Sequence, residues 1–384
     1  MYTTFFTRFY VFAFCSRCYL YLPIFVVWLL RQGLTQTDVM LLISLYIGSA
    51  LLAELPTGLF ADRFGRKWAL FAGSGLQVLG ALCLVPAHAF AWYALGECLL
   101  GVGYAFKTGA TEALLYDHLK ERNATADYQR RYANAKFFEF AAMSVGAVVG
   151  APLYIAFPQG PFYGTAMLFL AAALTALTIP EPPSTTVALR LRTLLAGWRE
   201  IRVGVPALRA LIGYYGWFFS LVLIVTTTLS QPYLRTLGVP LSAFGWVFLG
   251  CNMLAMGGTL AANRWGSHLL GHHFFLQLGL GCIAICLGLA IGRTTGAIVI
   301  LALIYAAWGL LLPTVSAAVN RLVASERRAT VLSIQDFLQN GIFIPAALGV
   351  GWLVDHRGFP TTFFVLAVVS AAVLTVTVRW LKRS

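Results

Sequence analysis

Apolar stretches of about 20 residues recur along the whole chain, and each is long enough to cross the hydrocarbon core of a bilayer as a helix. Of 384 residues, 59% are hydrophobic and 11% are charged, and the mean hydropathy is +0.79. A soluble domain carries about a quarter charged residues. The sequence therefore predicts an all-α membrane protein whose twelve transmembrane helices cover residues 6–30, 37–60, 68–86, 90–117, 134–157, 161–179, 210–232, 240–262, 274–292, 295–320, 330–354 and 359–380.

Basic residues gather on one side of these spans. With the N-terminus inside the cell, twenty-one Lys and Arg residues fall at cytoplasmic ends and four at outer ends, while Arg17 and Lys107 lie within spans. Cytoplasmic loops carry an excess of positive charge, so both termini are predicted to be cytoplasmic and the location to be the bacterial inner membrane. Anionic lipid explains the net charge of +13 without a nucleic-acid partner.

A polar interval beginning with EPPSTT divides the chain in the middle. We expect an N-terminal six-helix bundle over residues 1–180, a linker over 181–209 and a C-terminal six-helix bundle over 210–384. Basic and apolar residues alternate at helical spacing in the linker, which indicates an amphipathic helix that either takes part in gating or is passive. The turns ADRFG (61–65) and ANRWG (262–266) follow the second and eighth spans and indicate two pseudo-symmetric halves.

The stretch ELPTGLFADRFGRK (54–67) concentrates charges between two apolar spans. Gly58 is expected to allow close helix approach and Gly65 a tight turn. Asp62 suits the positive N-terminal end of a neighbouring helix, and the basic residues after it bind carboxylates or lipid headgroups. Such a cluster can latch two helix bundles together in one conformation and release them in another.

This stretch resembles the signature of the Major Facilitator Superfamily, a glycine and an Asp-Arg pair followed by a second glycine and two basic residues. The matching residues are Gly58, Asp62, Arg63, Gly65, Arg66 and Lys67. The resemblance implies that Asp62 faces the start of the eleventh span in the outward-open state and that Arg66 pairs with Asp117. The extended form with Glu54, together with TGATEALLYDHL (108–119) and ERRATVLSIQDF (326–337), is similar to a bacterial drug-efflux-like branch.

Two positions depart from the family pattern. Glu97 stands four residues before Gly101, where the family's fourth-span motif begins with an arginine. The fifth-span antiporter motif appears only as GAVVGAP (146–152), with Ala151 inserted before the proline. Both departures weigh against proton antiport.

Ionisable residues within spans cost a few kcal/mol on insertion scales and therefore point to function. The proton or substrate site is predicted to use Arg17, Glu97, Lys107, Glu112, Glu139 and Asp336. We expect the first, fourth and fifth spans to bring the N-terminal members into one cavity, with Glu112 and Glu139 as proton carriers. Arg17 or Lys107 then contacts an anionic group or holds a carboxylate in place. The alternative is a set of ion pairs that fixes helix register.

Aromatic residues in the C-terminal half offer a second candidate contact, a pocket for a flat or lipophilic compound. The candidates are Tyr214, Trp217, Tyr305 and Trp308, and the alternative is packing or anchoring at the membrane interface. The pair Cys15/Cys18 is assigned to packing because no second pair accompanies it. No metal or cofactor is predicted, and the energy source is expected to be the proton gradient.

The function predicted from these features is secondary active transport by alternating access. The leading hypothesis is proton-coupled export of small amphipathic drugs or metabolites, an antiport associated with multidrug resistance. The alternative is a proton-coupled uptake symporter of a small polar or anionic solute. An enzyme is not expected, because the chain has neither an HExxH motif nor a phosphate-binding loop. The expected partners are a small-molecule substrate and the lipid bilayer, and the protein is expected to be a monomer.

Overall fold

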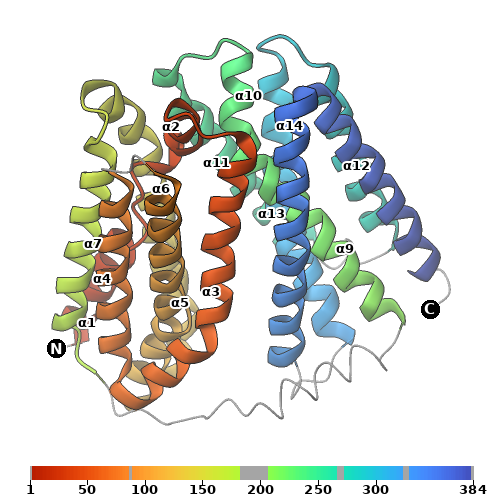
Figure 1. Cartoon of the computed structure of the whole chain (residues 1–384). Coiled ribbons are helices and arrows are strands. Elements are labelled where there is room, and N and C mark those ends of the chain that lie inside the picture. Colours follow the sequence, from red (N-terminus) through yellow and green to blue (C-terminus); the bar gives the residue numbers. More distant parts are fainter. Residues whose placement is uncertain (1, 86–88, 182–205, 266–271, 323–327, 382–384) are drawn as a thin grey trace. The chain divides into compact units, whose positions relative to one another are not determined.

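The computed structural model describes residues 2–85, 89–181, 206–265, 272–322 and 328–381, and all regular elements in these ranges are helical (Figure 1). Within them, nine helices are long and apolar enough to cross a membrane, while α1 (Tyr2–Cys15) and α2 (Phe25–Arg31) are shorter. The all-α fold is as predicted, but the count of twelve spans is not confirmed. The predicted amphipathic linker helix lies outside the described residues.

The helices form two compact units. Unit 1 comprises Met1–Phe25, Leu42–Ala188 and Leu241–Trp246, and unit 2 comprises Val26–Leu41, Leu189–Pro240 and Val247–Ser384. The division differs from the two halves of the sequence in two places, since Val26–Leu41 belongs to unit 2 and Leu241–Trp246 to unit 1. One long helix, α3 (Gln36–Phe64), therefore takes part in both units.

Unit 1 holds α1, the short helix η1 (Leu22–Ile24), most of α3, and the helices α4 (Arg66–Leu84), α5 (Phe90–Glu121), η2 (Thr125–Asp127), α6 (Tyr128–Ala156) and α7 (Gly160–Thr178). Unit 2 holds α2, α9 (Pro206–Leu223), η3 (Ile224–Leu229), α10 (Ser230–Thr236), most of α11 (Leu241–Trp265), α12 (His272–Ile291), α13 (Ala297–Leu322) and α14 (Arg328–Leu381).

Glycines allow a close helix contact in unit 1, between α4 and α5. A Cβ at Gly80 would lie 2.8 Å from the carbonyl oxygen of Gly96, and one at Gly96 would lie 3.0 Å from that of Gly80. Seven residues away, Gly73 and Gly103 make the same reciprocal contact. Small residues at such spacing let two backbones approach closely, which is how helices associate without a hydrophobic driving force in lipid.

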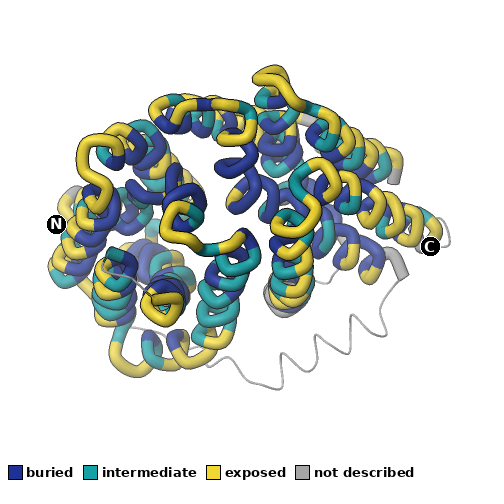
Figure 2. Tube along the Cα trace, turned by 45° about the horizontal axis from the view of Figure 1, so that its top comes forward, coloured by how far each residue is buried: buried dark blue, intermediate teal, exposed yellow. Residues whose placement is uncertain are grey.

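Large apolar side chains cover the outward helix faces in both units. Leu52 and Ile291 are each 80% exposed, and Met167 is 71% exposed. The exposed residues follow the outer turns of the helices while buried residues line their inner turns (Figure 2). This distribution suits a protein whose outer surface meets acyl chains rather than water.

The last two predicted spans are joined without a loop. Helical structure continues through α14, and only Gly358, at φ +73° and ψ 175°, departs from helical geometry within it. A positive φ is readily adopted by glycine, so this residue reverses the chain direction at the predicted boundary between the spans.

Candidate functional site

The first predicted span is broken, so the expectation of one continuous helix over 6–30 is wrong. Helix α1 ends at Cys15, and regular structure resumes only at Leu22. Pro23 supplies a physical reason, because it lacks a backbone N–H and its ring clashes with the carbonyl group four residues earlier. We call residues 16–21 the break.

Side chains of three other helices bind the break. Lys107 Nζ of α5 donates hydrogen bonds to the Ser16 carbonyl oxygen, at 3.0 Å, and to Gln77 Oε1 of α4. Gln77 Nε2 in turn donates to Tyr19 Oη at 3.1 Å. Thr165 Oγ1 of α7 accepts from Leu20 N at 3.0 Å. These bonds satisfy backbone groups that a continuous helix would have paired internally.

Helix α6 presents two glycines to the same segment. A Cβ at Gly146 would lie 2.7 Å from the carbonyl oxygen of Tyr19, and one at Gly150 would overlap the carbonyl group of Leu20. Both belong to GAVVGAP, which the sequence suggested as a degenerate antiporter motif. In the structure, these glycines make room for the irregular backbone of the break.

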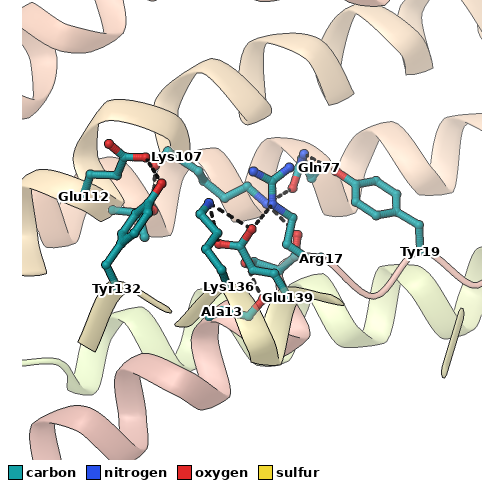
Figure 3. Close-up of polar contacts among 11 residues, drawn as sticks. Ala13, Arg17, Tyr19, Gln77, Lys107, Glu112, Tyr132, Lys136 and Glu139 are labelled. Atoms are coloured by element: carbon teal, nitrogen blue, oxygen red, sulfur yellow. Dashed lines mark hydrogen bonds and ion pairs between the residues drawn. The ribbon is translucent and has the colours of Figure 1, made fainter. Parts of the chain in front are cut away.

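Arg17 lies in the break and forms the charged part of the site. Its Nε is 3.4 Å from Glu139 Oε2 of α6, and its guanidinium group lies over the ring of Tyr104, 4.8 Å from the centroid. Lys136 Nζ lies 3.2 Å from the same carboxylate oxygen. Figure 3 shows Arg17, Lys107, Lys136 and Glu139 gathered together. We call these four residues the charged cluster.

The charged cluster holds three basic side chains and one acid. Lys107 is 5% exposed, whereas the Arg17 side chain is 26% exposed. Arg17 meets Glu139 through Nε, and the face of its guanidinium group lies over Tyr104. An arrangement of this kind suits recognition of a polar or anionic group beside an aromatic surface.

The remaining predicted charges lie elsewhere. Glu112 accepts a hydrogen bond of 2.9 Å from Tyr132 Oη and stands apart from the charged cluster (Figure 3). Glu97 is buried on α5, 4% exposed, and Asp336 is exposed on α14 of unit 2. The structure thus places Arg17, Lys107 and Glu139 near one another and leaves Glu112 out, and their role as a proton or substrate site stays a prediction.

Several residues of the site were not singled out by the sequence. Gln77, Tyr19, Tyr104 and Lys136 complete the contacts to the break and the charged cluster. The available signal was Pro23, since a proline within an apolar span marks a place where backbone groups need other partners.

Unit 2 contains a related arrangement in its first long span. Here α9 passes into a π-helical segment, η3, ahead of Pro232 in α10. Tyr305 Oη of α13 donates to the Thr226 carbonyl oxygen at 3.0 Å. In each unit, therefore, an irregular segment precedes a proline and accepts a hydrogen bond from the predicted fourth helix of that half.

The candidate pocket aromatics have packing partners inside unit 2. Tyr214 Oη donates to the Phe275 carbonyl oxygen and Trp217 Nε1 donates to Ser370 Oγ, both at 2.9 Å. Tyr214 is fully buried. Tyr305 binds Thr226, and Trp308 lies 6.4 Å from Tyr305 between ring centroids. These contacts match the packing alternative, and the site described above does not include them.

The turn after α3 is built around an ion pair. Arg66 NH1 of α4 lies 2.9 Å from Asp117 Oδ2 of α5, and the two side chains are 13% and 8% exposed. The structure thus places together the pair that the family resemblance implied. Asp62 is half-buried and Arg63 is exposed, and the expected contact of Asp62 with the start of the eleventh span stays a prediction.

Glu181 also reaches this turn, although the sequence pointed only to a polar linker there. Lys67 N donates to Glu181 Oε1 at 3.3 Å, so a carboxylate from beyond α7 meets the N-terminus of α4. Its carboxylate fills the space that a side chain on Gly65 would take, and Gly65 has φ +100°. Gly58 differs from the expectation of close approach, because no other described atom lies within 4 Å of a Cβ placed there.

Membrane-length helices in two units, with a charged cluster in one of them, define a polytopic membrane protein. The chain belongs to the Major Facilitator Superfamily, whose profile matches residues 9–347. It is a transporter and not an enzyme.

Solved structures share this fold. The structure of the nucleoside transporter NupG aligns with a TM-score of 0.84 at 14% identity, covering 98% of this chain and 99% of that one. A point mutant of NupG aligns with a TM-score of 0.86 over the same shares, also at 14% identity. No curated protein matches the sequence. Neither the profile nor these structures specify a drug-efflux branch.

Proposed function

We propose that the protein is a secondary active transporter that takes up a small polar or anionic solute together with protons by alternating access. The charged cluster carries this proposal, because Arg17 is partly exposed beside Tyr104 while basic groups outnumber acids around it. A lipophilic cation, the usual cargo of a drug exporter, would meet net positive charge there. Uptake of a polar or anionic solute, which was the alternative hypothesis from the sequence, is therefore favoured over export of a drug.

Two further observations support this choice. Gly146 and Gly150 belong to the stretch that resembles an antiporter motif. In the structure they instead lie against the backbone carbonyl groups of Tyr19 and Leu20 in the break. The fold is shared with a protein described as a nucleoside transporter, which makes a nucleoside a reasonable first probe. We propose the orientation predicted from the basic residues, with both termini in the cytoplasm of a bacterial cell.

The turn after α3 is proposed to act as the cytoplasmic gate. The buried pair Arg66–Asp117 fixes the start of α4 against α5, and Glu181 holds the backbone at Lys67. Asp62 and Arg63 at the end of α3, and Lys67 at the start of α4, would then engage the other bundle in one state only. Gly58 and Gly65 complete the motif.

Transport by the purified protein in liposomes tests the proposal. Uridine is the neutral probe, and the pair uracil and orotate, which differ by one carboxylate, tests the preference for an anion. We expect accumulation when the outside is acidic and loss of accumulation when a protonophore collapses the gradient. Accumulation that needs an acidic interior, or transport of a lipophilic cationic dye alone, would support export instead.

A further inference from the structure

Glu97 is a buried acid of unit 1 that belongs neither to the charged cluster nor to the gate. Its side chain is 4% exposed within unit 1, and it makes no hydrogen bond or ion pair with any residue that the structure describes. The other acids predicted in this half do have partners, since Glu139 meets Arg17 and Lys136, and Glu112 meets Tyr132. Glu97 is therefore the exception among them.

The position of Glu97 connects it with the break. Glu97, Gly101 and Tyr104 follow one another at helical spacing on one face of α5. Gly101 meets the carbonyl group of Tyr46 on α3, and Tyr104 lies under Arg17. The Glu97 carboxyl is also within electrostatic range of Tyr19 and Tyr21, which belong to the break. Glu97 thus faces the same segment as the charged cluster but is not part of it.

The groups around Glu97 are uncharged side chains. From the break come Tyr19 and Tyr21, and Cys98 is its neighbour on α5. On α4, Gly80 and Leu84 pack against the turn that contains Glu97, and Tyr46 and Ser49 approach from α3. A carboxylate without a cation costs several kcal/mol inside a protein surrounded by lipid, and a bound proton removes that charge.

We propose that Glu97 is the proton-binding group that couples transport to the proton gradient, while the charged cluster binds the solute. This inference rests on the proposed proton-coupled function. Loss of the proton leaves a carboxylate whose charge acts on the hydroxyl groups of Tyr19 and Tyr21 in the break. Tyr19 is hydrogen-bonded to Gln77, and Gln77 is hydrogen-bonded to Lys107. A change in the charge of Glu97 can therefore affect the charged cluster through Tyr19 and Gln77.

Chemical labelling tests the proposal without any knowledge of the solute. Dicyclohexylcarbodiimide reacts with protonated carboxyl groups in apolar surroundings, and mass spectrometry locates the adduct. In the full-length protein we expect labelling of Glu97 that declines as the pH rises, with Glu112 and Glu139 unlabelled. A Glu97 that stays unlabelled at all pH values, or labelling of Glu139 in its place, would overturn the proposal.

Transport by Glu97→Gln separates coupling from structure. We expect this variant to exchange internal for external uridine at the wild-type rate and to lose accumulation driven by a pH gradient, because exchange needs no net proton movement. Glu112→Gln, the matched control, should retain both activities. Loss of exchange together with accumulation would assign Glu97 a structural role, and retained accumulation, or accumulation driven by sodium alone, would also overturn the proposal.

The two experiments distinguish failure of this inference from failure of the proposed function. If the wild-type protein accumulates none of the probes under a proton gradient, proton-coupled uptake is wrong. The pH-dependent labelling of Glu97 still shows whether this carboxyl group binds a proton.

Discussion

Asp355 caps the start of α3 by accepting two hydrogen bonds from Thr37, one from the backbone N at 2.8 Å and one from Oγ1 at 2.6 Å. Its second oxygen accepts from Gln36 N at 2.9 Å. One turn earlier on α14, Gly351 leaves room for the backbone of Thr37, since a Cβ there would lie 2.8 Å from the Thr37 Cα. The end of the predicted eleventh span thus holds the beginning of the second, within unit 2.

Asp355→Asn is expected to destabilise the protein by about 1 kcal/mol, because the unpaired N–H groups at a helix N-terminus favour a charged acceptor. The loss should appear as a lower midpoint of thermal unfolding in detergent. Arg357→Gln removes an exposed charge two residues away and serves as the control. Equal midpoints for the two variants would show that the cap contributes nothing measurable.

Gly65→Ala is expected to disturb the turn between α3 and α4. A side chain at φ +100° is strained, and its Cβ would overlap the Glu181 carboxylate, so destabilisation of more than about 1 kcal/mol is expected. Expression level and thermal midpoint measure it. Gly58→Ala lies in the same motif with open space around its Cβ, and its stability should match the wild type. A reversed order of the two variants would contradict the structure.

Asp117→Asn should destabilise strongly, by roughly 3 kcal/mol, because it leaves the Arg66 guanidinium group buried without its acid. The double variant Arg66→Met/Asp117→Leu removes both charges and should recover much of that loss. A double-mutant cycle on thermal midpoints measures the coupling. Purely additive effects would mean that the ion pair does not fix α4 against α5.

Lys107→Met should loosen the break, since the Ser16 carbonyl group and Gln77 Oε1 lose their donor. Cys18, which lies in the break and is 1% exposed, reports on this change. With the other cysteines replaced, we expect Cys18 to react with a maleimide faster in Lys107→Met than in the parent. Lys136→Met, which removes a cation from Glu139 but does not bind the break, should leave the rate unchanged.

Much of the fold followed from the pattern of apolar segments, because a bilayer leaves a chain few options besides helices. The spans from 37–60 to 161–179 correspond to α3 through α7, and the signature around Asp62 indicated the superfamily correctly. The first span was misjudged because hydropathy counts apolar side chains and ignores backbone pairing. Helix α1 ends at Cys15 and Pro23 lies in the short helix that follows, so the backbone pairing is interrupted without a change in the apolar character of the segment.

The site was only partly accessible to such reasoning. Arg17, Lys107 and Glu139 stood out because charges are rare in spans, and the structure brings them together. Gln77 and Tyr104 did not stand out, since polar and aromatic residues are common in membrane helices. Which acid remained without a partner depended on the rotation of α5 and α6, and the sequence does not specify that rotation.

The placement of residues 26–41 in unit 2 has a consequence for the order of synthesis. Asp355 follows Thr37 by 318 residues, so a ribosome adding about 5–20 residues per second needs roughly 15 to 60 s to supply the cap. Until then the start of α3 lacks its Asp355 cap, although the other end of the helix can already pack with α4 and α5. Every newly made molecule therefore passes through a state in which the start of α3 lacks this cap. Variants that delay the insertion of the last two spans should increase degradation of the protein before transport is affected.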